Sequence, residues 1–323
     1  MKPIRLVLGG ALAALLATTA LAQTPAPWPT KTVRWVMPFA PGGVSDVEAR
    51  LMATKLGEKW GQQVIVDNKV GGFTVVAAND VARSAPDGHT LLQAVDFTWT
   101  MNQFMFSRPS YDPLKDFTHI SIMARLPLVF ISNDKVPAKN IAELVAAAKA
   151  RPGTIAVGGS GPALQIAFEK FVREAGIKML YVPYKGGADV FKGLMTGEIA
   201  VGIDASVAYM DMFKQGRLHA LATTGGQRAA ALPNVPTLPE LGYKASEFYL
   251  WHSLSGPAGM SPALVRKIQN DVQAVLAVPE TRDRFLAMGL EPVGSSAEQI
   301  LETIRRESAS GGTIVKELGL KLD

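Results

Sequence analysis

Two glycine-containing turns carry the residues of this sequence best suited to bind a charged molecule. The first is Pro41-Gly42-Gly43-Val44-Ser45-Asp46, and the second is Gly158-Gly159-Ser160-Gly161-Pro162. Each follows an apolar strand pattern and precedes an amphipathic helix pattern, so each presents the N-terminus of a helix. The first N–H groups of a helix lack partners within the helix, and the helix dipole makes this end positive. The turns therefore predict a carboxylate-binding site that glycine allows the ligand to approach closely.

The pairing of the turns matters, because a single glycine turn more often serves only to reverse the chain. Two turns that face one cleft could hold the two ends of one acid. Asp46 has two possible roles in this arrangement. It either interacts favourably with the dipole in the first helical turn or contacts the ligand, where its negative charge would be costly.

The second turn also resembles the G-x-S-x-G turn of serine hydrolases, with Pro162 in place of the last glycine. The alternative prediction is an exported hydrolase that uses Ser160, with His219 or His252 as the base. No order of serine, acid and histidine supports it. The four histidines are isolated, and the sequence contains neither a metal-binding spacing nor a nucleotide-binding glycine motif. We therefore expect no enzyme activity, no cofactor and no metal.

Aromatic side chains lie near the expected ends of several strands. Asp96-Phe97-Thr98-Trp99 directly follows the strand pattern from Thr90 to Val95. Ligand clefts of open α/β sheets form at strand ends, so Phe97, Thr98 and Trp99 could form a wall of the cleft. The alternative is that these aromatic residues belong to the core.

The elements that must position these residues alternate between strand and helix patterns. In a first group we expect strands at Thr32 to Phe39, Val64 to Val66 and Thr90 to Val95, a helix from about Ser45 with a Ser45 and Glu48 capping box, and a helix from Val75 to Arg83. In a second group we expect strands at Leu128 to Ser132, Thr154 to Val157, Met179 to Val182, Ile199 to Ile203 and Leu218 to Thr223, a helix from Ile141 to Lys149 capped by Asn140, a helix through Phe168 and Phe171, and a helix from Ala188 to Met195.

The C-terminal part is expected to return to the first group. Prolines at 233, 236 and 239 predict a stiff crossing, after which come a strand at Tyr249 to Leu254 and helices at Pro262 to Leu276, Glu280 to Met288 and Ala297 to Ser308. The sequence thus predicts an α/β fold of two lobes, each a mixed sheet flanked by helices. Lobe 1 would hold residues 23–125 and 235–323, and lobe 2 residues 126–234.

The N-terminus and the composition place the protein in a cell compartment. Lys2 and Arg5 precede an apolar run that leads to Ala20-Leu21-Ala22, a pattern typical of a signal peptide (residues 1–22) cleaved between Ala22 and Gln23. The run is short for a membrane span. The chain has no cysteine, which excludes disulfides and thiolate metal sites. Its net charge of +5 is spread without a basic block, so nucleic acid is not an expected partner. We expect a periplasmic protein.

Several segments, in their order and spacing, resemble the solute-binding component of tripartite tricarboxylate transporters, also called the Bordetella uptake gene family. The resemblance runs nearly end to end and includes Met37-Pro38-Phe39-Ala40-Pro41-Gly42-Gly43, Ala85-Pro86-Asp87-Gly88-His89-Thr90-Leu91-Leu92, Tyr111-Asp112-Pro113-Leu114-Lys115-Asp116-Phe117, Val182-Pro183-Tyr184-Lys185-Gly186 and Gly256-Pro257-Ala258-Gly259. It implies a type II periplasmic binding fold that delivers a carboxylate to membrane permease subunits. We expect the protein to act as a monomer. A ligand-sensing accessory protein of a membrane sensor is a further alternative.

The resemblance also implies site residues, because relatives hold the carboxylate through the two turns and a segment of the second lobe. With Phe97 and Thr98 added from their strand-end position, the expected ligand-binding residues are Phe39, Pro41, Gly42, Gly43, Val44, Ser45, Asp46, Phe97, Thr98, Gly159, Ser160, Gly161, Pro162, Asp204, Ala205 and Ser206. Relatives usually carry a fuller glycine-rich loop where this chain has Lys69-Val70-Gly71-Gly72-Phe73-Thr74. With Phe97 and Trp99, Phe73 favours an aromatic or bulky carboxylate over citrate.

Overall fold

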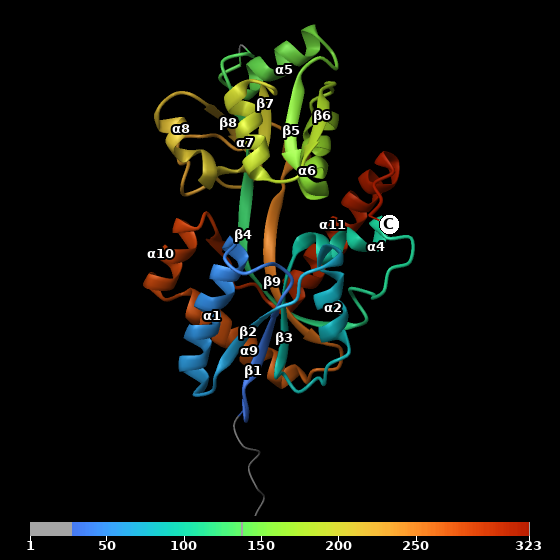
Figure 1. The fold of residues 1–323 in the computed structure, drawn as a ribbon, viewed down its shortest axis with the longest axis vertical. Coiled ribbons are helices and arrows are strands. Elements are labelled where there is room, and N and C mark those ends of the chain that lie inside the picture. Colours follow the sequence, from blue (N-terminus) through green and yellow to red (C-terminus); the bar gives the residue numbers. More distant parts are fainter. Residues whose placement is uncertain (1–27, 137, 323) are drawn as a thin grey trace, which may run out of the picture.

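Two α/β lobes, joined by the long strands β4 (Phe117–Ser132) and β9 (Tyr249–Pro257), form the protein in the computed structural model (Figure 1). The structure describes residues 28–136 and 138–322, so the expected signal peptide and its cleavage site lie outside the described residues. The predicted fold class, mixed sheets flanked by helices in two lobes, is confirmed. Within the described ranges, no helix is long and apolar enough to cross a membrane.

The first lobe is built on parallel strands that the β4 and β9 pair extends. Strand β1 pairs in parallel with β2 and β3, and β3 then pairs antiparallel with β9. The strands of this lobe are β1 (Val33–Met37), β2 (Val64–Asn68), β3 (Thr90–Val95) and the short β10 (Glu291–Pro292), which pairs with β4. Its helices are α1 (Val44–Trp60), η1 (Gly72–Thr74), α2 (Val75–Ala82), α3 (Asp96–Thr100), α4 (Asn102–Met105), α9 (Pro262–Leu276), α10 (Pro279–Ala287) and α11 (Ala297–Leu318).

The second lobe begins where β4 changes partner. Pro127 pairs with β9, whereas Leu128 pairs with β7. The strands that follow β4 here are β5 (Ala156–Ser160), β6 (Leu180–Tyr184), β7 (Val201–Ala205) and β8 (His219–Thr223). The helices are α5 (Ile141–Ala150), α6 (Gly161–Glu174), α7 (Gly187–Thr196), η2 (Ser206–Tyr209), α8 (Met210–Lys214) and η3 (Lys244–Ser246).

The C-terminal helices pack largely as the apolar patterns predict. Val265, Ile268 and Val272 of α9 lie in one core cluster with Val33 and Trp35 of β1, which confirms that α9 returns to the first lobe. Helix α11 is longer than expected. Its residues Ile314 and Val315 belong to a cluster that contains second-lobe side chains, so α11 contacts both lobes.

Two local predictions about helix starts have different outcomes. The Asn140 cap of α5 is confirmed, because its side chain accepts a hydrogen bond from the Glu143 amide at 2.9 Å. The capping box of Ser45 and Glu48 is wrong. Helix α1 begins at Val44 with Gly43 as its N-cap and no side-chain cap, and the Glu48 side chain is buried instead.

The return of the chain to the first lobe occurs later than the prolines indicate. Leu232 lies in a core cluster with Val190 and Tyr209, and the segment after it still hydrogen-bonds β8, from the Leu238 amide to the Thr223 carbonyl oxygen at 2.8 Å. The chain reaches the first lobe only in β9, where Tyr249 pairs with Pro127. The two crossings therefore lie side by side as adjacent strands.

Candidate functional site

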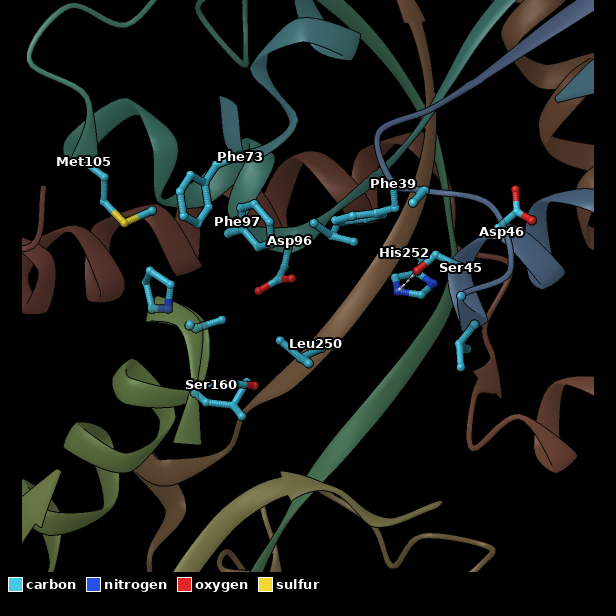
Figure 2. A pocket seen from close by; sticks show the side chains of 18 of the residues that line it. Phe39, Ser45, Asp46, Phe73, Asp96, Phe97, Met105, Ser160, Leu250 and His252 are labelled. Atoms are coloured by element: carbon cyan, nitrogen blue, oxygen red, sulfur yellow. Dashed lines mark hydrogen bonds between the residues drawn. The ribbon is translucent and has the colours of Figure 1, made fainter. Parts of the chain in front are cut away.

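A cavity of about 560 Å³ lies between the lobes and is lined by both glycine-containing turns. Figure 2 shows side chains from the two lobes around it. The first turn contributes Phe39, Ala40, Pro41, Gly43, Val44, Ser45 and Asp46. The second contributes Ser160, Gly161, Pro162, Ala163 and Leu164. The central prediction, that the turns of opposite lobes share one cavity, agrees with this geometry.

The first turn presents backbone amides to the cavity. Gly42 has a φ of 91°, a left-handed conformation that favours glycine, and Gly43 is extended (φ −75°, ψ 166°). The first intrahelical bonds run from the Asp46 and Val47 amides to the Gly43 carbonyl oxygen, each at 3.0 Å. The amides of Val44 and Ser45 precede these bonds, so they are the helix donors available to an anion.

Asp46 supports the turn. Its carboxylate accepts hydrogen bonds from the Gly42 amide at 3.0 Å, from Arg50 at 2.9 and 3.1 Å, and from Asn68 at 2.9 Å. Burial opposes ionisation, but these donors outweigh it and lower the pKa of Asp46 to about 2. In Figure 2 the carboxylate is directed away from the other labelled side chains. Asp46 thus fixes the conformation of the turn, and the Gly42 amide is used internally.

The second turn is organised differently, because two of its glycines belong to β5. A Cβ atom on Gly158 would lie 2.3 Å from Ile199 Cδ1, and one on Gly159 would lie 2.7 Å from the Tyr181 hydroxyl. These glycines therefore serve packing. Gly161, the first residue of α6, has a φ of 75° and open space around it. Pro162 has no N–H group, so α6 offers fewer donors than α1.

A buried polar cluster, made of Ser45, Glu48, Gln93 and His252, lies behind the first turn. His252 Nδ1 hydrogen-bonds Glu48, and His252 Nε2 lies 3.4 Å from Ser45 Oγ. Gln93 donates to Glu48 at 3.0 Å and accepts from Trp35 Nε1 at 2.9 Å. Burial favours the neutral imidazole, but the charge and the hydrogen bond of Glu48 outweigh it and raise the pKa of His252. Sequence reasoning missed this cluster, since its members are isolated in the chain.

The cluster has the order serine, imidazole and carboxylate, but its electrostatics favour binding over acyl transfer. A general base must be neutral to accept a proton, whereas the raised pKa keeps His252 in its cationic form to higher pH. In its cationic form His252 donates to Ser45 Oγ, which leaves the Ser45 proton free for an anion in the cavity. Ser160 is not paired with a histidine in the described chain, because His219 contacts Asp134 and His252 contacts Ser45 and Glu48.

The remaining wall is mainly apolar, with one acid in it. Phe73, Phe97, Leu250 and Met105 line the cavity together with Asp96. Phe73 is 47% exposed and has a φ of 48°, an uncommon conformation for a bulky residue. Of these residues only Phe97 was among the expected site residues, and Phe73 was noted only as an aromatic residue that favours a bulky ligand. Asp96, which is 1% exposed, was not recognised as a site residue.

Several expected residues lie outside the cavity lining, namely Gly42, Thr98, Gly159, Asp204, Ala205 and Ser206. Thr98 is buried with its hydroxyl 2.8 Å from that of Thr74. Asp204 accepts hydrogen bonds from the Tyr209 hydroxyl at 2.7 Å and the Ala205 amide at 2.8 Å. Of the two alternatives for Trp99, the structure supports the core, because its ring is fully buried and its Nε1 donates to Ser253 Oγ at 2.8 Å. In the described residues no group of acids and histidines is placed to hold a metal.

Two lobes joined by adjacent strands, with helix N-termini from both lobes at one cavity, define the class of periplasmic solute-binding proteins. A model of the tripartite tricarboxylate transporter family receptor matches residues 48–320. The chain belongs to this family.

Relatives and solved structures agree with this assignment. BugT of Bordetella pertussis (strain Tohama I) is 30% identical over 298 residues, which cover 91% of this chain and 91% of BugT. The structure of Rpa4515 of R. palustris with adipate has a TM-score of 0.75 and 30% identity, over 90% of this chain and 98% of that one. The structure of MatC (Rpa3494) from Rhodopseudomonas palustris with bound malate has a TM-score of 0.70 and 25% identity, over 89% and 99%.

Proposed function

We propose that this protein captures a small organic carboxylate in the periplasm and delivers it to the permease subunits of a tripartite tricarboxylate-type transporter. The observation that carries the proposal is the cavity shared by Gly43 and Gly161, each at the start of a helix in a different lobe. Helix N-termini attract anions, and an anion between two of them interacts with both lobes. The neighbours with adipate and malate add support, because both ligands are carboxylates.

The apolar wall extends the proposal to a class of acid. Phe39, Phe73, Phe97 and Leu250 line the cavity, and such surfaces favour a ligand with a hydrocarbon or aromatic body between its polar ends. We therefore favour a di- or aromatic carboxylate over a compact hydroxylated acid such as citrate.

We also propose that the ligand closes the two lobes by bending β4 and β9. In this proposal the two lobes divide the chain where β4 and β9 cross, rather than at residues 125 and 235 as expected from the sequence. Adjacent strands at Leu126 and Leu250 form a compact hinge, since Leu126 pairs with Leu250. A ligand held by both turns favours the closed state, which the permease would recognise. The protein would act as a monomer after removal of residues 1–22.

The substitution Val44→Pro tests the backbone site. Proline is tolerated at the first helical position, and the extended Gly43 before it has a conformation compatible with a following proline. The change removes one N–H group and leaves the fold intact. A hydrogen bond to a charged group contributes about 1.5–3 kcal/mol, so calorimetry should show a loss of affinity of about tenfold or more for the best-bound acid.

Val44→Ala is the matched control, because it removes the half-exposed side chain and keeps the amide. Its affinity should remain within about threefold of the parent protein. Equal affinities of the proline and alanine variants would contradict the backbone site. A response to sugars or cations, with none to acids, would reject the ligand class. Hydrolysis of carboxylate esters by the parent protein would favour the alternative of a serine hydrolase.

A further inference from the structure

One wall of the cavity contains a buried acid, one carboxyl oxygen of which has no hydrogen-bond partner among the described residues. Asp96 follows β3, is 1% exposed and lines the cavity. Its Oδ2 atom has no hydrogen-bond partner among the described residues, whereas the backbone amides of Phe97 and Asp96 bond to the carboxyl group. In Figure 2 the carboxyl group is directed toward Ser160 and Leu250, across the space between the lobes. An unsatisfied buried oxygen is costly, so it marks a position where a ligand atom belongs.

We propose that Asp96 determines specificity by donating, in its protonated form, a hydrogen bond to an acceptor oxygen at the second polar end of the ligand. The inference rests on the proposed function, since it concerns a carboxylate already held at the α1 turn. It narrows the ligand to acids whose second end carries a carboxylate or carbonyl oxygen. It disfavours ligands whose second end is an ammonium group.

The groups around Asp96 favour its protonated form. Burial and then the charge of Glu307 on α11 raise the pKa of Asp96 to about 8, and His252 on β9 acts in the opposite direction. Glu48 on α1 hydrogen-bonds that histidine, so the positive charge of His252 is partly compensated by Glu48 rather than by Asp96. Glu307 accepts from Trp251 Nε1 at 2.8 Å and also interacts with Lys170 on α6 and Arg306 on α11. The strand β3 and the helix α4 carry no ionisable side chain. Tyr111 donates to the Thr98 carbonyl oxygen, and His119 on β4 packs against Trp99 of α3. Burial lowers the pKa of His119 to about 4, so this imidazole adds no positive charge beside α3.

The arrangement of polar groups in the cavity also favours a hydrogen bond donated by Asp96 over a salt bridge between Asp96 and a cationic ligand. An ammonium group carries three N–H donors and loses stability in an apolar cavity unless several acceptors surround it. Here a single carboxyl oxygen is free, and Phe73, Phe97 and Leu250 surround the space. The helix N-termini of α1 and α6 further raise the positive potential at the cavity. An acceptor oxygen therefore satisfies Asp96 at a lower desolvation cost than a cation.

A matched set of ligands tests this assignment by calorimetry between pH 6 and 9.5. The set comprises the best-bound diacid of a succinate-to-suberate series, the monoacid of the same length and the corresponding ω-amino acid. We expect the diacid to bind most tightly and to lose affinity about tenfold per pH unit above about pH 8, as Asp96 ionises. Binding of the monoacid should show no such fall, and the ω-amino acid should bind no better than the monoacid.

Variants at Asp96 separate the roles of charge and donor. Asp96→Asn keeps a donor at every pH, so diacid binding should remain strong and become independent of pH. Asp96→Ala lacks the donor and should bind the diacid about tenfold more weakly than Asp96→Asn, so that the preference of the protein for the diacid over the monoacid is reduced. Asp283 is an exposed acid on α10, and Asp283→Asn is the control for net charge. This variant should lose diacid affinity above about pH 8 as the parent protein does.

Each outcome separates this inference from the proposed function. Diacid binding that depends neither on pH nor on Asp96 would overturn the assignment while leaving carboxylate capture intact. Tighter binding of the ω-amino acid, abolished by Asp96→Asn, would show that Asp96 acts as an anion. If no acid binds, the proposed function falls. Carbon NMR titration of the Asp96 carboxyl group in the ligand-free protein tests its protonation independently of binding. A titration midpoint near pH 4 would also overturn the assignment.

Discussion

Replacing Glu48 by glutamine should destabilise the protein strongly, because Glu48 is the buried counterion of His252. The Glu48 side chain is fully buried and the His252 side chain is 7% exposed. Removing one partner of a buried ion pair costs about 3–5 kcal/mol. His252 escapes part of this cost by losing its proton, so we expect a loss of about 3 kcal/mol in the free energy of unfolding near pH 6. Urea unfolding of the purified protein measures it.

The stability lost in Glu48→Gln should depend on pH, because the ion pair requires a protonated His252. The folded protein has a raised His252 pKa, so the pair's contribution is fully present below the unfolded value of about 6.5. It is lost as the pH rises through the folded pKa. The difference between the parent protein and Glu48→Gln should therefore shrink from pH 6 to pH 9. Glu280→Gln, at the exposed pair with Lys55, is the control and should change stability by less than about 0.5 kcal/mol.

A double replacement distinguishes the loss of the ion pair from a change in side-chain packing. Glu48→Met with His252→Phe removes both charges and keeps comparable volume, and such exchanges are often neutral or stabilising. We expect the double variant to lose less stability than Glu48→Gln alone. The reasoning would be refuted if Glu48→Gln lost under about 1 kcal/mol, or if its loss were the same at every pH.

Two further predictions concern the turn and the cavity wall. Asp46→Asn should lose about 1–2 kcal/mol of stability at pH 7, because the pKa of Asp46 is about 2 in the folded protein and 3.8 ordinarily. This contribution is present above pH 3.8 and disappears as the pH falls toward 2. Equal urea midpoints of the parent protein and the variant at pH 7 would contradict the prediction. Phe73→Ala should weaken binding of an aromatic diacid by about tenfold and binding of succinate much less, since Phe73 lines the cavity with its exposed ring; calorimetry with both acids checks the contrast.

The sequence was sufficient for the features that follow from local chemistry. Apolar spacing predicted α9, the Asn140 side chain predicted the start of α5, and glycines at strand ends predicted the two turns. Helix starts depend on a few neighbouring residues, so a short window contains the required information. Ser45 shows the limit of such a window. Its spacing from Glu48 matches a capping box, yet Glu48 bonds to His252, which lies far along the chain.

The parts of the site that the sequence did not predict depend on contacts between distant segments. Asp96 and His252 are unremarkable in their own segments, and they become neighbours only because β3 pairs with β9, with Val95 opposite His252. For the same reason the sequence left open whether Trp99 lies in the cleft or in the core. A strand-end position does not say whether a ring faces the cleft or the core, and the hydrogen bond to Ser253 holds this one inside.

The net charge of +5 says little about how this site would attract an anion, because the local arrangement decides it. Asp46 is negative beside the first turn, but Arg50 and Asn68 bind its carboxylate on the far side. Glu48 and His252 compensate each other. The polar groups that face the cavity are then the amide end of α1, the start of α6, the hydroxyl of Ser45 and the carboxyl group of Asp96, which we propose to be protonated; all of these can donate hydrogen bonds. A site with buried acids nearby can therefore still favour a carboxylate, provided each acid is held by its own donors or protonated.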